Sequence, residues 1–148
     1  LPTSGEAPEA DSGVREPVFS GTGRVLFMDD DEAVNITARK MLEHIGFSVE
    51  IALYGREAVD LYEKSLAAGT PYDLVILDLT IPGGMGGKKT IELLTALDPG
   101  VKAIVSSGYS NDLIMANYTD YGFKGVIAKP YRIEELGKVI KQVLGNNT

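Results

Sequence analysis

From residue 24 onward, two kinds of hydrophobic pattern alternate along the chain. Short apolar runs indicate strands that are buried on both faces of a sheet. Between these runs, apolar residues recur every three or four positions, which is the spacing of an amphipathic helix. The runs predict five strands, at residues 25–28, 48–52, 74–77, 102–106 and 126–128.

Each predicted strand is followed by a predicted helix. The first helix starts after a group of acids, which suit a helix amino terminus because carboxylates accept hydrogen bonds from its free amides. Gly46 is a typical residue for its carboxyl-terminal end. The other helices are expected near residues 58–66, 87–97, 111–121 and 133–144.

Five strand–helix units in a chain of 148 residues predict one α/β domain. Right-handed crossovers leave few arrangements at this size. We expect a flavodoxin-like, doubly wound fold with a five-stranded parallel sheet in the order 2-1-3-4-5 and five helices on its two faces.

Residues 1–23 differ in composition from the rest of the chain. They contain three prolines and four glycines but few large apolar side chains. Such a segment cannot bury enough surface to offset the entropy lost on ordering. We therefore predict a flexible linker or tail at residues 1–23 and a single domain at residues 24–148.

Composition and charge exclude several classes of function. The net charge of −7 argues against a nucleic-acid-binding surface. The chain has no cysteine, which excludes disulfides, thiolate metal sites and a cysteine nucleophile. No apolar run reaches the roughly 20 residues of a membrane helix, and no secretory signal is present. We expect a cytoplasmic domain that makes no membrane contact.

Four of the five predicted strands end in polar residues with chemical potential. In chain order these residues are Asp29 and Asp30, Asp78, Ser106 and Ser107, and Lys129. The carboxyl ends of parallel strands share one edge of a sheet, and these four strands are neighbours in the predicted order. We therefore expect the polar groups to converge.

The chemistry of the predicted cluster is coherent. Carboxylates held close together repel one another and favour a bound cation. Oxygen ligands without histidine or cysteine suit Mg²⁺. An aspartate beside Mg²⁺ can also act as a nucleophile and form an acyl phosphate. A lysine can pair with a carboxylate or with a phosphoryl oxygen.

Four motifs carry a resemblance to a known family. They are Val25-Leu26-Phe27-Met28-Asp29-Asp30, Leu77-Asp78-Leu79-Thr80-Ile81-Pro82-Gly83, Val105-Ser106-Ser107-Gly108-Tyr109 and Ala128-Lys129-Pro130-Tyr131. Together they make residues 24–145 similar to the receiver domain of the two-component response-regulator family. The combination is more specific than any single motif.

The resemblance implies a role for each acid in the cluster. Asp78 matches the family's phosphoacceptor, and Asp29 with Asp30 matches its acidic pair. Asp30 would contact Mg²⁺ directly and Asp29 through water, with the backbone carbonyl of Thr80 as a further ligand. Asp31 matches the residue that starts the following helix.

The resemblance also implies the residues that respond to phosphorylation. Ser107 matches the family's switch Ser/Thr, since a small residue follows it and Lys129 stands 22 residues later. Lys129 matches the family's lysine, which precedes a cis proline bond. Val126 departs from the pattern, because many receivers have Tyr or Phe there. Val126 cannot make the usual rotation of that ring, although Tyr109 and Tyr131 are near enough to contribute.

As a receiver, the domain would take its phosphoryl group from a histidine kinase, in the same chain or in another. A histidine phosphotransfer protein is a further candidate partner. A linker-like segment before the domain, with nothing after it, favours the receiver of a hybrid sensor kinase. The alternative is a stand-alone response regulator.

Three other classes of function compete with the receiver interpretation. A Mg²⁺-dependent phosphohydrolase of the haloacid-dehalogenase kind would need a second acid two residues after Asp78, where Thr80 stands. A flavodoxin-like mononucleotide binder would need a phosphate-binding loop after the first strand, where three aspartates stand. An inert interaction module would not require the intact set of polar residues.

Overall fold

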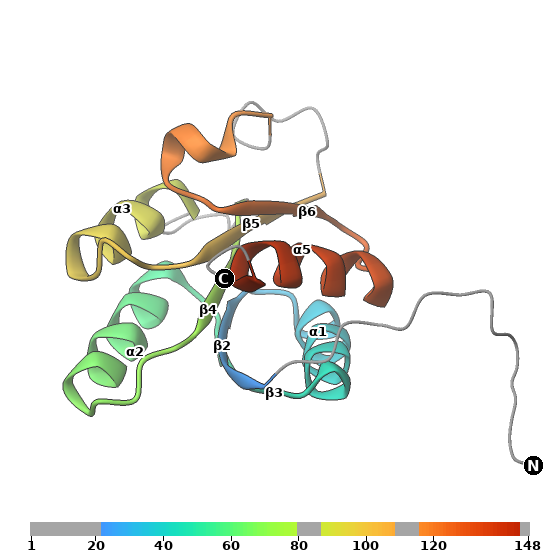
Figure 1. The fold of residues 1–148 in the computed structure, drawn as a ribbon, viewed down its shortest axis with the longest axis horizontal. Helices are drawn as coiled ribbons and strands as arrows, with labels where there is room; N and C mark the ends of the chain where they lie inside the picture. Colours follow the sequence, from blue (N-terminus) through green and yellow to red (C-terminus); the bar gives the residue numbers. More distant parts are fainter. Residues whose placement is uncertain (1–21, 80–86, 109–115, 146–148) are drawn as a thin grey trace, which may run out of the picture.

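The computed structural model describes residues 22–79, 87–108 and 116–145 (Figure 1). Within these ranges, five strands alternate with four α-helices and one 3₁₀ helix. In chain order they are β2 (Gly23–Met28), α1 (Glu32–Ile45), β3 (Phe47–Ala52), α2 (Gly55–Ala67), β4 (Leu74–Asp78), α3 (Gly87–Leu97), β5 (Ala103–Ser107), η2 (Tyr118–Tyr121), β6 (Gly125–Ala128) and α5 (Ile133–Gly145).

The five strands form one parallel sheet in the order β3-β2-β4-β5-β6. Numbered along the chain, this order is 2-1-3-4-5, so the predicted flavodoxin-like topology is confirmed. Figure 1 shows α1 and α5 on one face of the sheet and α2 and α3 on the other. In the part of the chain described, no helix is both long and apolar enough to cross a membrane.

Alternate residues of the inner strands pack into two separate cores, one on each face of the sheet. In β4, Leu74 and Ile76 pack with residues of α1 and α5, whereas Val75 and Leu77 pack with residues of α2 and α3. Both faces are buried, which explains why the strand is apolar throughout. Because side chains alternate along a strand, Asp78 follows Ile76 onto the α1/α5 face.

The predicted strands and helices match the observed ones apart from their ends. The strands extend by one or two residues at one end or shift by one, as in β2, which begins at Gly23. Gly46 closes α1 with a φ of 128°, as predicted. Residues 111–115 of the predicted fourth helix lie outside the described residues, and its last part is the 3₁₀ helix η2, which ends at Tyr121 and is capped by Gly122. Most of the predicted linker, Thr80 and Tyr109 also lie outside them.

Candidate functional site

Three aspartates gather at the carboxyl edge of the sheet. Asp29 follows β2 and Asp78 ends β4, and their exposed fractions are 0% and 2%. Asp30 is exposed. One carboxylate oxygen of each lies within 4.8 Å of the others. The parallel topology thus brings together acids that are 48 residues apart in the sequence.

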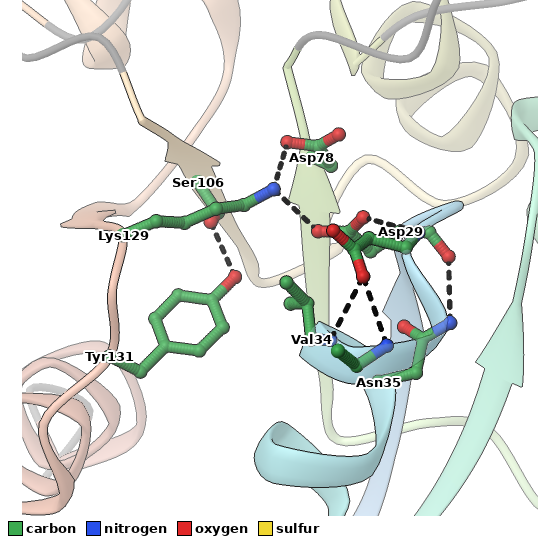
Figure 2. A network of polar contacts seen from close by, with 9 residues as sticks. Asp29, Val34, Asn35, Asp78, Ser106, Lys129 and Tyr131 are labelled. Carbon is green, nitrogen blue, oxygen red and sulfur yellow. Dashed lines mark hydrogen bonds and ion pairs between the residues drawn. The ribbon is translucent and has the colours of Figure 1, made fainter.

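Lys129 reaches this cluster from the end of β6 (Figure 2). Its Nζ lies 2.6 Å from Oδ2 of Asp29 and 3.0 Å from Oδ1 of Asp78. The backbone N–H of Lys129 donates to the carbonyl of Ser107 at 3.0 Å. The Lys129–Pro130 bond is cis, as the family resemblance implies. Lys129 therefore joins the two buried acids and also connects β6 to β5.

The environment of Lys129 keeps it charged. Burial by itself would lower the pKa of its ammonium group. Hydrogen bonds and charge from Asp29 and Asp78 outweigh this effect and raise the pKa above the usual value. The buried carboxylates therefore face a permanent cation at neutral pH.

The start of α1 holds Asp29 in place. The backbone N–H of Asp29 donates to the carbonyl of Ala52 at 3.0 Å, and the carbonyl of Asp29 accepts from the side-chain amide of Asn35 at 2.9 Å. The N–H of Asp31 donates to Oδ1 of Asp29 at 2.9 Å. The carboxylate of Asp31 caps α1 by accepting from the N–H of Ala33 at 2.9 Å. Asp31 thus starts the helix, as the resemblance implies.

The two serines at the end of β5 have different surroundings. Both are fully buried. Ser106 is the cross-strand partner of Asp78, and its Oγ lies 2.5 Å from Oη of Tyr131. Ser107 is the next residue along the strand, so its side chain lies on the opposite face of the sheet. Its carbonyl accepts a hydrogen bond from the backbone N–H of Lys129.

The contact between Ser106 and Tyr131 was not predicted from the sequence. Strand alternation does place Ser106 on the same face as Asp78, which is a signal that the sequence contains. The position of the Tyr131 ring depends on the loop after β6, and no periodic pattern specifies that loop.

The donor set fits a divalent cation such as Mg²⁺. Three carboxylates beside one ammonium group leave a formal charge of −3 + 1 = −2, which a divalent ion would neutralise. All three acids offer hard oxygen ligands, and Asp30 is open to solvent. The carbonyl of Thr80, the fourth predicted ligand, lies outside the described residues.

Comparison with known proteins gives one consistent family. Residues 25–141 match the family model of the response regulator receiver domain. The sensor kinase CckA of Brucella abortus is 30% identical over 126 residues, which are 85% of this chain but only 13% of that protein. Sporulation initiation phosphotransferase F of Bacillus subtilis is 26% identical over 121 residues, which are 82% of this chain and 93% of that protein.

A solved structure supports the same assignment. The CheY-like response regulator receiver domain protein of Methanospirillum hungatei is 28% identical, with a TM-score of 0.73. The match covers 85% of this chain and 96% of that one. These matches favour a receiver over the phosphohydrolase and mononucleotide-binding alternatives.

Proposed function

This chain belongs to the response regulator receiver domain family of two-component signalling, and we propose that it accepts a phosphoryl group on the carboxylate of Asp78. The observation that carries the proposal is the position of Asp78. It ends β4, is almost fully buried, and lies 3.0 Å from the ammonium group of Lys129 beside two further acids.

In the proposed reaction, a carboxylate oxygen of Asp78 attacks the phosphorus of a phosphohistidine on a histidine kinase. The new O–P bond forms as the P–N bond breaks. The electron pair of the P–N bond stays on the histidine nitrogen, which is protonated as it leaves. Bound Mg²⁺, held by Asp29, Asp30 and Asp78, would neutralise negative charge on the transferring phosphoryl oxygens.

Lys129 supplies the second source of positive charge. Its ammonium group already faces Asp78, so a small movement would pair it with a phosphoryl oxygen instead. Its pairing with Asp29 keeps the group at the site. Ser107, linked to Lys129 through its backbone carbonyl, is the proposed switch residue, whose hydroxyl would donate to another phosphoryl oxygen.

The phosphodonor is a histidine kinase, in the same chain or in a separate one, and a histidine phosphotransfer protein is a further partner in this proposal. Similarity to part of a sensor kinase supports the first arrangement. Similarity over nearly the whole length of a phosphotransferase supports a stand-alone regulator. We favour the hybrid-kinase receiver and keep the stand-alone regulator as the alternative.

The direct test uses the purified chain with acetyl phosphate and Mg²⁺. Intact-mass spectrometry should show a gain of one phosphoryl group, which hydroxylamine removes because the adduct is an acyl phosphate. Addition of EDTA before acetyl phosphate should prevent the gain. A chain that stays unmodified under these conditions would overturn the proposal.

The Asp30→Asn variant tests the metal-binding role. Asp30 is the exposed member of three clustered carboxylates, so removal of its charge reduces repulsion while it removes a ligand. We expect Mg²⁺ affinity, measured by calorimetric titration, to fall by at least about tenfold. Without metal, urea unfolding should show the variant to be no less stable than the parent. A clear loss of stability would instead identify Asp30 as a structural residue.

The Ser107→Ala variant tests the switch. Val126 is partly buried on the α2/α3 face, and it has no ring to rotate there. Coupling should therefore depend on Ser107 and on the backbone that follows it. We expect the variant to accept phosphate on Asp78 but to lose most of the beryllofluoride-induced amide NMR shifts in residues 108–131. Shifts equal to those of the parent would move the coupling role to another residue.

A further inference from the structure

A partly buried polar contact lies beside the ion pairs of the proposed phosphoacceptor site (Figure 2). The hydroxyls of Ser106 and Tyr131 are 2.5 Å apart. Ser106 is also the cross-strand partner of Asp78, and its carbonyl accepts from the N–H of Leu79 at 2.8 Å. One residue therefore links the strand end that carries Asp78 to the side chain of Tyr131.

Tyr131 also contacts the strand that leads to Asp29. Its ring packs edge-on against Phe27 of β2, with centroids 5.9 Å apart and an interplanar angle of 81°. Phe27 stands two residues before Asp29, and Tyr131 stands two residues after Lys129. The Tyr131 side chain thus contacts both β2, which leads to Asp29, and β5, the neighbour of the strand that ends at Asp78.

The surroundings of Tyr131 favour a neutral hydroxyl. Burial raises the pKa of its phenol, and the nearby charges of Asp29 and Asp78 add to the rise, although the hydrogen bond with Ser106 acts in the opposite direction. The hydroxyl therefore keeps its proton across the neutral pH range and can share a hydrogen bond with Ser106.

Two anchors on β5 hold the segment that carries Lys129. The N–H of Lys129 donates to the carbonyl of Ser107, and the Tyr131 hydroxyl bonds to that of Ser106. With its segment held at these two points, Lys129 places a flexible four-carbon side chain against two carboxylates at once. Loss of either anchor would allow the segment to move, and small displacements of a charged group slow a reaction markedly.

We propose that Tyr131 is a positioning residue for phosphoryl transfer: its hydroxyl, bound to Ser106, holds Lys129 in register with Asp29 and Asp78. The proposal rests on the proposed function of Asp78 as phosphoacceptor. It assigns a role to Ser106 that differs from that of Ser107. It also gives Tyr131 a task on the α1/α5 face, opposite to the face that Val126 occupies.

The test compares Tyr131→Phe, Ser106→Ala and the double variant in phosphorylation by acetyl phosphate with Mg²⁺. Each single variant should lower the maximal rate constant about three- to tenfold, the effect of one hydrogen bond. The half-saturating concentration of acetyl phosphate should not change. Because both substitutions remove the same contact, the double variant should be no slower than the slower single variant.

Tyr62→Phe is the matched control. Tyr62 is a buried tyrosine, whereas Tyr131 is partly buried, and the Tyr62 hydroxyl likewise makes one side-chain hydrogen bond, to Asp98 at 2.7 Å. Asp98 precedes β5 and lies near Asp73, which precedes β4, so this hydrogen bond is at the amino edge of the sheet. The control should lose a similar amount of stability and keep the parent's phosphorylation rate.

A second readout is independent of phosphorylation. In the metal-free protein, Tyr131→Phe should shift the amide NMR signals of Lys129 and Ser107, and Tyr62→Phe should leave them unchanged. If the parent is phosphorylated but Tyr131→Phe reacts at the parent rate, or the double variant shows the product of two independent losses, the positioning role is wrong. If the parent itself forms no hydroxylamine-sensitive adduct, the proposed function fails, and the positioning role fails with it.

Discussion

Replacement of Asp78 by asparagine is expected to abolish the phosphoryl adduct that the parent chain forms with acetyl phosphate and Mg²⁺. An amide oxygen carries no negative charge, so it is a far weaker nucleophile than a carboxylate oxygen. Asp78 is the single acid of β4, and no other residue of that strand could replace it. Intact-mass spectrometry of the variant should show no gain under conditions that modify the parent fully.

The loss should reflect chemistry and not unfolding. Asparagine has nearly the same shape as aspartate, and Asp29, whose Oδ2 lies 2.6 Å from Lys129 Nζ in the parent, should still pair with Lys129 when the charge of Asp78 is removed. Circular dichroism should therefore show a folded variant with a cooperative thermal transition. Asp60→Asn, an exposed substitution on α2, is the matched control and should be modified like the parent. An undiminished mass gain in Asp78→Asn would show that another residue accepts the phosphoryl group.

The fold could be predicted because the inner strands are apolar on both faces. Leu74, Val75, Ile76 and Leu77 pack into two different cores, and this double burial produces the uninterrupted apolar runs. The ends of the strands were harder to predict, because backbone pairing can extend beyond the apolar run on either side. Gly23 shows this, since it pairs with Phe47 although it carries no side chain to signal burial.

The cluster of acids could be predicted because it follows from topology alone. Once the strand order is known, the residues after β2 and β4 must share one edge of the sheet. The hydrogen-bond partners around this cluster could not be predicted in the same way. No pattern in the sequence indicates that Asn35 holds the carbonyl of Asp29 or that Tyr131 bonds to Ser106, because both contacts depend on side-chain directions outside the strands.

The departure at Val126 has a clearer meaning with the structure at hand. The sequence suggests Tyr131 as a replacement for the missing aromatic ring, but Tyr131 is partly buried and packs with Phe27 against the core on the α1/α5 face. Val126 packs on the opposite face with the core of α2 and α3. The two positions therefore serve different surfaces, which is why we assign Tyr131 to the placement of Lys129 and not to the switch.

Replacement of Lys129 by methionine should reduce the free energy of unfolding by about 3 kcal/mol in the absence of metal, because two buried carboxylates lose a cationic partner. Asp29 and Asp78 are 0% and 2% exposed, so water cannot compensate for that loss. The expected loss is at the low end of the range for a broken buried ion pair, since the Lys129 side chain is itself 20% exposed. Urea unfolding in EDTA measures the difference.

Magnesium should then stabilise Lys129→Met more than it stabilises the parent. In the parent, the ammonium group already neutralises part of the charge of Asp29 and Asp78, so it competes with a bound cation. Without that ammonium group, Mg²⁺ that binds only the folded state should raise the free energy of unfolding of the variant by about 2.7 kcal/mol when its concentration is about 100 times its Kd. Lys124→Met, which removes an exposed lysine between η2 and β6, should change stability by less than about 0.5 kcal/mol in either condition. Equal Mg²⁺ stabilisation of both variants and the parent would mean that Lys129 does not compete with the ion, and the shared acidic site would have to be revised.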